Sequence, residues 1–287
     1  MSAAPDLLSL VLILRPLTAG APQRPLPQWW GRAAQALLLD VVRRADEALA
    51  AELHDESGLR PYTASNLMGH FGAGRQPLCE QTYTLRFTAL TARLSALLLQ
   101  AVRPGGALAP GAALQLDYLP FRVEAVHLDP AGHPWAGQAA YDDFAAGHLV
   151  GAAPPRRLTL QLASPTTFHV NGRHLPLPLA EQVFASLLER WNAFAPLALP
   201  AETRRFAAEC LHLSRYRLNS LAVPVKEGGL RIGAVGEVTY TASVYDRFWL
   251  SALYHLAEFA RYAGLGSGTG YGLGQARRLP SPGRAAE

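Results

Sequence analysis

His54 and Arg60 have side chains that could support chemistry, and they lie six positions apart in a polar stretch of the first half. An imidazole ordinarily titrates at about pH 6.5, so it can accept and donate protons at neutral pH. A guanidinium keeps its positive charge and does not act as an acid, so Arg60 could stabilise developing negative charge but not supply a proton. A histidine at a helix C-terminus could instead interact with the helix dipole, which is the structural alternative for His54.

Three residues beyond this pair could assist it: Tyr62, Ser65 and His70. His70 is the second candidate histidine because it lies in a glycine-containing loop just after the same predicted strand. The dipeptide His54-Asp55 also occurs in metal-dependent HD phosphohydrolases. Those sites need further spaced histidine and aspartate ligands, and the sequence shows no convincing set.

Four other histidines form two pairs in the sequence: His127 with His133, and His169 with His174. Zinc would need third and fourth ligands at suitable spacing, and the two isolated cysteines, Cys79 and Cys210, do not supply them. We therefore expect no metal and no cofactor. The absence of a CxxC pair or a disulfide framework indicates a reducing, cytoplasmic protein with buried thiols.

A run near the carboxyl end places six glycines at alternate positions: Gly264, Gly266, Gly268, Gly270, Gly272 and Gly274. Glycine allows a backbone to approach a phosphate closely, and successive N–H groups can form an anion-binding concavity. A flexible surface loop is the structural alternative. A P-loop would require a lysine, and a dinucleotide fingerprint would open a helix after a strand. This run instead follows a predicted helix and leads into a strand.

The chain carries 26 basic and 22 acidic residues, and Lys226 is its only lysine. Arginine suits phosphate recognition through its planar fork, although a GC-rich genome would also favour it. Several arginines of the second half are candidates for phosphate binding: Arg156, Arg157, Arg204, Arg205, Arg215, Arg217 and Arg231. A solvated basic face is the structural alternative, and the aromatic signature of RRM sheets is absent.

These residues must be positioned by a regular set of elements. In the first half, apolar periodicity predicts strands at 8–14, 61–65, 82–87 and 114–126, with helices at 30–53 and 91–102. The second half predicts strands at 158–162, 216–225, 230–240 and 275–279, and helices at 179–194 and 247–262. The apolar run 7–14 is too short to cross a bilayer, which takes about 20 residues, so it indicates a buried strand rather than a membrane partner.

Both halves follow the order β-α-β-β-α-β, which is the split βαβ or ferredoxin-like plan. Asp246 can cap the last helix and Gly264 can end it. A loop at 129–155, rich in proline, glycine and histidine, separates the halves. We therefore predict an N-terminal domain at 1–150 and a C-terminal domain at 151–287.

A glycine-rich run between the last helix and last strand of a ferredoxin-like domain resembles the RAMP superfamily of CRISPR-associated proteins. Further segments resemble the precursor-crRNA processing endoribonucleases, the sixth numbered Cas family: ARYAGLG at 260–266, GYGLG at 270–274, LASPTTF at 162–168, PLP at 176–178 and RWN at 190–192. His54, followed by RPYTAS at 60–65, resembles the catalytic region of that family. The resemblance covers both halves in the same order.

The resemblance implies an α+β protein of two tandem ferredoxin-like (RRM-like) domains that cuts CRISPR repeat RNA within precursor crRNA. Cleavage would use the RNA 2′-hydroxyl, need no metal, and leave a 2′,3′-cyclic phosphate and a 5′-hydroxyl. His54 would be the base or acid and Arg60 the electrostatic group, where the family often has lysine. Some relatives also use a tyrosine on the first helix, whereas this chain has Leu39 near that place.

The same resemblance implies that RNA is bound by the glycine run together with basic residues of the second half: Arg156, Arg157, Arg215, Arg217 and Arg231. Other Cas proteins of an effector complex would be further partners, and a homodimer stays open. Two alternatives remain. A non-catalytic RAMP subunit would share the fold and bind RNA without cutting it, and a nucleotide-dependent enzyme would bind ATP or NAD at the glycine run.

Overall fold

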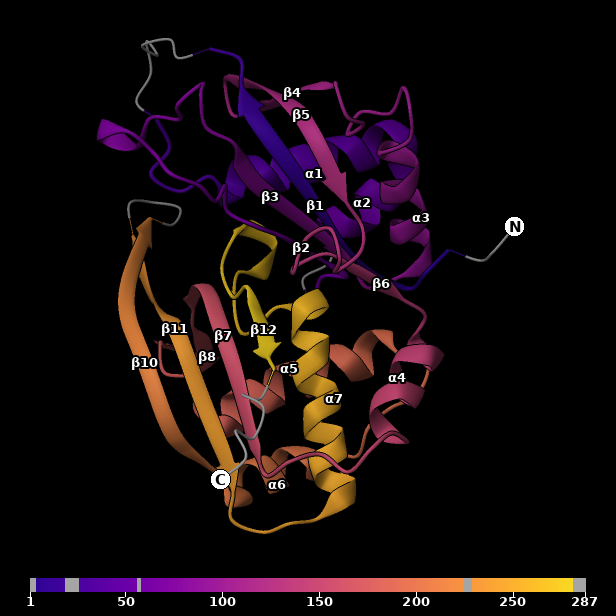
Figure 1. The fold of residues 1–287 in the computed structure, drawn as a ribbon, viewed down its shortest axis with the longest axis vertical. Coiled ribbons are helices and arrows are strands. Elements are labelled where there is room, and N and C mark those ends of the chain that lie inside the picture. Colours follow the sequence, from indigo (N-terminus) through magenta and orange to yellow (C-terminus); the bar gives the residue numbers. More distant parts are fainter. Residues whose placement is uncertain (1–3, 19–25, 56–57, 225–228, 281–287) are drawn as a thin grey trace. The chain divides into compact units, whose positions relative to one another are not determined.

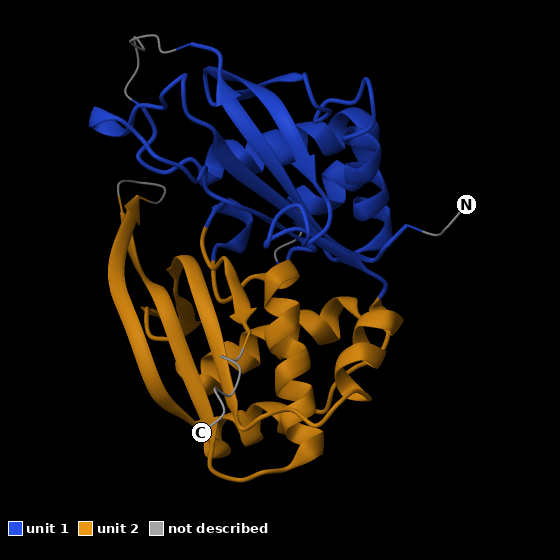
Figure 2. Cartoon of the chain, viewed as in Figure 1, with its two compact units in different colours: residues 1–140, 268–272 blue, residues 141–267, 273–287 orange. Residues whose placement is uncertain are grey.

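The computed structural model describes residues 4–18, 26–55, 58–224 and 229–280 of the 287-residue chain. The chain divides into two compact units (Figure 2). Unit 1 comprises residues 1–140 with 268–272, and unit 2 comprises residues 141–267 with 273–287. The sequence-based division was placed after residue 150. The middle of the glycine run thus belongs to unit 1, whereas its two ends belong to unit 2.

A six-stranded antiparallel sheet forms the centre of unit 1 (Figure 1). Its strands are β1 (Leu7–Pro16), β2 (Tyr62–Ala64), β3 (Tyr83–Ala89), β4 (Ala113–Leu116), β5 (Leu119–His127) and β6 (Gly137–Ala139). They follow the order β2-β3-β1-β5-β4, and β6 also pairs with β1. Strand β1 pairs with three strands and is buried along most of its length, which confirms the predicted buried first strand.

The helices of unit 1 are α1 (Gly31–Ala45), α2 (Glu47–Asp55) and α3 (Ala92–Ala101), with a 3₁₀ turn η1 (Ala73–Arg75). The prediction of one continuous helix over 30–53 was wrong. Asp46 adopts an extended conformation, and its Oδ1 accepts a hydrogen bond from Leu49 N at 2.9 Å. This bond, and then the bond from Arg93, lowers the pKa of the Asp46 carboxyl. An aspartate that caps a new helix therefore ends α1, although the helical spacing of apolar residues continues across it.

Unit 2 contains a four-stranded antiparallel sheet of β7 (Arg157–Thr166), β10 (Leu211–Pro224), β11 (Leu230–Ala242) and β12 (Ala276–Leu279) in the order β10-β11-β7-β12. Its helices are α4 (Tyr141–Leu149), α5 (Ala180–Phe194), α6 (Glu202–Cys210) and α7 (Arg247–Ala263), and β8 (Phe168–Val170) pairs with β9 (Arg173–Leu175). Asp246 caps α7 through Trp249 N at 3.1 Å, as expected. Residues 225–228, at the junction of the predicted strands 216–225 and 230–240, lie outside the described residues.

In each unit the first strand lies between the third and the fourth strand of the ferredoxin-like plan, and the second lies at the edge beyond the third. The fold is therefore α+β with two tandem ferredoxin-like domains, as predicted. Strand β4 and strand β6 extend the sheet of unit 1. Among the described helices, none combines the length and apolar composition needed to cross a membrane.

The segment 129–155, predicted as a loop, contains β6 and helix α4. Tyr141 and Phe144 of α4 are buried, and the Tyr141 ring meets the Trp191 ring edge-on with centroids 5.2 Å apart. The helix is stabilised by these contacts within unit 2. Helix α6 and the β8–β9 hairpin were also missed, because both are short and carry mostly exposed side chains.

His255 on α7 is fully buried among aromatic rings of α4 and α5. Its ring centroid lies 4.1 Å from that of Trp191 and 5.0 Å from that of Phe144. Within the described part of the chain neither ring nitrogen has a hydrogen-bond partner. Burial, and to a smaller extent the neighbouring His148, lowers the pKa of His255 to about 3. The folded protein therefore holds this imidazole neutral.

This buried imidazole predicts acid sensitivity. In the unfolded chain a histidine binds a proton below about pH 6.5, while folded His255 stays neutral until about pH 3. Its contribution to stability is thus complete above about pH 6.5 and is lost as the pH falls, by up to ~1.4 kcal/mol per pH unit. Urea unfolding between pH 7 and pH 4 should show a shallower pH dependence for His255→Leu than for the wild type. Equal slopes in the two proteins would contradict the assignment.

Candidate active site

His54 lies at the carboxyl end of α2, where its side chain is exposed. The helix begins at the Asp46 cap, and Leu49 and Leu53, four residues apart, anchor one face of it in the core of unit 1. His54 follows Leu53 directly and therefore points away from that core. An exposed imidazole at a helix end can meet a bound substrate, so this placement is compatible with proton transfer.

Arg60 is half-buried and is tied to the same helix end. Its Nη1 donates to Leu53 O at 2.6 Å and to Tyr62 Oη at 3.2 Å. Because Leu53 is the residue before His54, this bond brings the guanidinium of Arg60 beside the end of the helix that carries the imidazole. The structure thus places the two predicted catalytic residues at one locus of unit 1.

The other candidates near this pair have structural contacts. Ser65 is buried, its Oγ donates to Asn66 O, and it accepts from Arg86 N, both at 2.8 Å. His70 is exposed, and its carbonyl accepts a hydrogen bond from Tyr83 Oη at 2.6 Å. Tyr62 is fully buried. Its hydroxyl accepts from Gln35 Nε2 at 3.0 Å as well as from Arg60, a contact across 27 residues that sequence spacing does not reveal.

The centre of the glycine run packs within unit 1, against α1 and β2. It contains a 3₁₀ turn, η3 (Thr269–Tyr271), whose Tyr271 O accepts a hydrogen bond from Trp29 Nε1 at 2.8 Å. A side chain at Gly31 would overlap Tyr271 O. Gly272 has a φ of 99° and bridges to Ser65 of the segment after β2. These glycines permit close packing of backbone on backbone.

The two ends of the run pack within unit 2. Gly264, Gly266 and Gly274 all have positive φ. Gly264 N donates to Ala260 O at 2.9 Å, Gly266 N to Ser186 Oγ at 2.9 Å, and Gly274 N to Pro165 O at 3.0 Å. Buried Arg190 donates to Gly266 O at 2.8 Å. The amides of these three glycines are therefore engaged inside the protein. Of the other three, Gly268 is half-buried, whereas Gly270 and Gly272 are buried.

The sheet of unit 2 brings two of the predicted RNA-binding arginines together. Cross-strand pairing aligns one row of four residues on β10, β11, β7 and β12: Arg217, Glu237, Gln161 and Arg277. The neighbouring row is Arg215, Thr239, Thr159 and Leu279. Cross-strand neighbours share a face of the sheet, so Arg215, Arg217 and Arg277 lie on one face. Sequence reasoning did not select Arg277, whose Nε donates to Gln161 Oε1 at 2.7 Å.

The remaining predicted arginines are more dispersed. Arg156 donates to Ser243 O at 3.0 Å and stacks over the Tyr245 ring. Arg157, at the start of β7, pairs with Thr241 of β11, and Arg231 pairs with Val223 near the end of the β10–β11 hairpin. Two others form ion pairs on helices, Arg204 with Glu181 at 2.7 Å and Arg205 with Glu209 at 3.8 Å.

The histidine pairs each come together without forming a larger cluster. The rings of His169 and His174 face each other across the β8–β9 hairpin, and the rings of His127 and His133 stack. Burial and nearby Arg231 lower the pKa of His174. No group of three or more metal-ligating side chains occurs in the part of the chain that the structure describes. Both cysteines are free but half-buried, not buried as expected.

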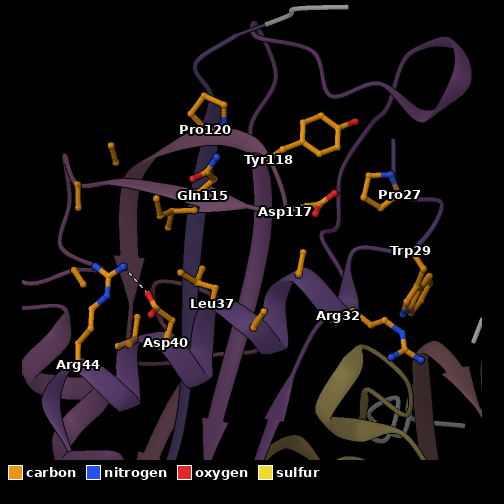
Figure 3. A pocket seen from close by; sticks show the side chains of 17 residues that line it. Pro27, Trp29, Arg32, Leu37, Asp40, Arg44, Gln115, Asp117, Tyr118 and Pro120 are labelled. Atoms are coloured by element: carbon orange, nitrogen blue, oxygen red, sulfur yellow. Dashed lines mark ion pairs between the residues drawn. The ribbon is translucent and has the colours of Figure 1, made fainter. Parts of the chain in front are cut away.

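A groove of about 1200 Å³ on unit 1 lies between α1 and the β4–β5 edge (Figure 3). Its two arginines, Arg32 and Arg44, are matched by Asp40 and Asp117, and Arg44 pairs with Asp40 at 2.6 Å. The groove does not include His54 or Arg60. Its balanced charge gives a polyanion no net attraction, so the helix end at His54 is the better candidate site.

Residues 160–276 match the family model "CRISPR-associated endoribonuclease Cas6". A Cas6 from Thermus thermophilus, solved as a product complex, is 26% identical with a TM-score of 0.77, and the alignment covers 95% of this chain and 100% of that chain. A second Cas6 product complex is 29% identical with a TM-score of 0.75, covering 96% and 99%. Residues 160–276 thus carry a Cas6-family domain, and the whole chain is similar in structure to these Cas6 proteins. None of the curated proteins matches it in sequence.

The second Cas6 has also been solved with a substrate mimic, at 28% identity and a TM-score of 0.72, covering 97% of this chain and 100% of that chain. It has been solved as well with one histidine replaced by alanine. A RAMP protein that binds different RNA substrates is only 14% identical, with a TM-score of 0.59, and shares the fold. The predicted resemblance to Cas6 and the predicted fold are thus confirmed.

Proposed function

We propose that this protein cuts CRISPR repeat RNA within precursor crRNA to produce guide RNAs for antiviral defence. The observation that carries the proposal is the exposed His54 at the end of α2, beside the Leu53 carbonyl that Arg60 holds. The match of residues 160–276 to the Cas6 family model and the similar Cas6 proteins solved with product and substrate mimic support RNA as the substrate.

Cleavage requires a group that transfers protons and a group that stabilises negative charge, and the two side chains can take these roles. A base removes the proton of the 2′-hydroxyl, and this oxygen attacks the adjacent phosphorus. The bond from phosphorus to the 5′-oxygen then breaks, and the leaving oxygen takes a proton from protonated His54 or from water. The products are a 2′,3′-cyclic phosphate and a 5′-hydroxyl. His54 acts as base or acid, and Arg60 stabilises the charge on the pentacoordinate phosphorus.

Arg60 has donors for this role in addition to its structural bonds. Both observed hydrogen bonds to the protein run from Nη1, while the guanidinium carries further N–H groups on Nε and Nη2. Arginine presents these donors in a fixed fork that matches phosphate geometry. The side chain can therefore hold the helix end with one nitrogen and approach a phosphate with the others.

RNA binding would rest on the cationic residues of unit 2 and on the accessible part of the glycine run. We propose that Arg156, Arg157, Arg215, Arg217 and Arg231 contact phosphates, with half-buried Gly268 as the backbone contribution. Each phosphate contact would make binding weaker at higher salt. The enzyme would work in the cytoplasm, and the product would pass to an effector complex of other Cas proteins.

Cleavage should need no divalent metal, since the nucleophile is part of the RNA. We expect wild-type protein with the repeat RNA of its own locus to cut equally well in EDTA and in magnesium. The 5′ fragment should end in a cyclic phosphate, detected by mass or by resistance to phosphatase before acid treatment. Cleavage that stops in EDTA and returns with magnesium would contradict this chemistry.

A further inference from the structure

We propose that Tyr62 and Gln35 are positioning residues that act through Arg60, and that the turn Thr269–Tyr271 holds them in place. The inference rests on the proposed function of His54 and Arg60. It assigns the centre of the glycine run a role inside the protein, on the catalytic side chains, in addition to any contact with RNA.

The first step is the hydrogen-bonded chain from α1 to α2. Gln35 Nε2 donates to Tyr62 Oη at 3.0 Å, and Arg60 Nη1 donates to the same oxygen at 3.2 Å. The same Nη1 donates to Leu53 O at 2.6 Å. The phenol oxygen is therefore the fixed acceptor that sets the guanidinium of Arg60 against the end of the helix bearing His54.

The second step is the burial of Tyr62. Its side chain has no exposed surface and its strand, β2, pairs with β3, so the residue cannot touch RNA directly. Gln35 is half-buried on α1, and its amide is oriented by the same phenol. A buried hydroxyl that accepts two hydrogen bonds stabilises one arrangement of its donors. Any effect of Tyr62 on the rate of cleavage must therefore act through the position of the Arg60 side chain.

The third step is the position of the turn. A methyl group placed on Gly270 would lie 3.4 Å from Gln35 Nε2, 3.4 Å from the Tyr62 ring and 3.6 Å from Arg60 Cδ. The turn therefore lies next to all three members of the chain, separated from them by about the space of one methyl group. The turn is itself anchored by the bond from Trp29 Nε1 to Tyr271 O and by the Arg32 guanidinium, 5.5 Å from the Tyr271 ring centroid.

The three contacts come from segments far apart in the sequence, and each lies within unit 1. Together they place position 270 beside all three members of the chain, with room for a methyl group in ordinary van der Waals contact. Since a shift of about 1 Å in a catalytic group can cost about 100-fold in rate, even a small displacement of Arg60 would be measurable.

The test is Tyr62→Phe, which keeps the ring in the core and removes only the oxygen. With enzyme in excess over repeat RNA, we expect the single-turnover rate constant to fall about tenfold while the dissociation constant for RNA stays unchanged. In an Arg60→Ala background the same substitution should cause no further loss, because its effect passes through Arg60. Gln35→Ala should show the same pattern.

Tyr83→Phe is the matched control. Tyr83 is equally buried, and its hydroxyl bonds Leu78 N and His70 O, away from Arg60. It should lower thermal stability without changing the rate constant of the folded enzyme. Equal losses from Tyr62→Phe in the wild-type and Arg60→Ala backgrounds, or no loss in either, would overturn the inference. Normal cleavage by His54→Ala would instead overturn the proposed function on which it rests.

Discussion

Replacing His54 with alanine is expected to reduce cleavage of repeat RNA by at least about 10²–10⁴-fold, the usual contribution of a general base or acid. Binding should be largely unchanged, because the exposed side chain leaves helix α2 anchored by Leu49 and Leu53. The loss should appear in the single-turnover rate constant at saturating enzyme. A filter-binding or fluorescence measurement of affinity for the uncut RNA provides the second readout.

His70→Ala is the matched control, since His70 is another exposed histidine of unit 1 and its carbonyl contact with Tyr83 survives the substitution. It should cut at nearly the wild-type rate. A reversed result, with His70→Ala inactive and His54→Ala active, would move the catalytic role to the second candidate histidine. If the wild type binds repeat RNA and never cuts it, the non-catalytic RAMP alternative is correct.

The elements with strong local signals could be predicted from the sequence. Strand β1 shows as a continuous apolar run, and helix α7 has a capping aspartate at Asp246 and a terminal glycine at Gly264. These signals reside within a few neighbouring residues, so they need no knowledge of tertiary contacts. The order of such elements in both halves was sufficient for the ferredoxin-like plan.

Features that depend on distant contacts were missed. The break at Asp46 is determined by a capping bond and by Arg93, 47 residues away, neither of which alters the helical spacing of apolar residues. Helix α4 depends on burial against Trp191. In both cases the local structure depends on contacts that the intrinsic propensity of the segment does not reveal.

The residues of the candidate site also divide into those that local sequence indicates and those that only the folded chain brings together. His54 and Arg60 could be selected from residue type and spacing, whereas Gln35, Tyr62 and Gly270 meet only in the folded chain. The glycine run illustrates the limit of motif reasoning. Its composition suggested a phosphate-binding loop, yet the amides of Gly264 and Gly266 donate hydrogen bonds to oxygen atoms of the protein. A glycine-rich motif indicates that the backbone packs closely against another group, but it does not identify that group.

Arg60→Ala is expected to lower the single-turnover rate constant by about 10²–10³-fold, the scale found when one fixed donor to a developing charge is removed. The substitution also removes the bond to Leu53 O, so the helix end that carries His54 loses a fixed contact. Arg60→Lys should recover part of the rate, because it keeps the charge but lacks the planar fork that can bind the carbonyl and a phosphate together.

Arg122→Ala is the control for a general loss of positive charge, since Arg122 is an exposed arginine of β5 whose partner is Glu124 at 3.2 Å. Its rate should stay close to that of the wild type at matched salt.

The decisive comparison is between salt effects. A residue that acts on the transition state lowers the rate of the bound complex at every salt concentration, whereas a residue that only attracts RNA changes affinity and the slope of affinity against salt. An Arg60→Ala protein whose bound complex reacts at the wild-type rate would show that the guanidinium serves binding alone.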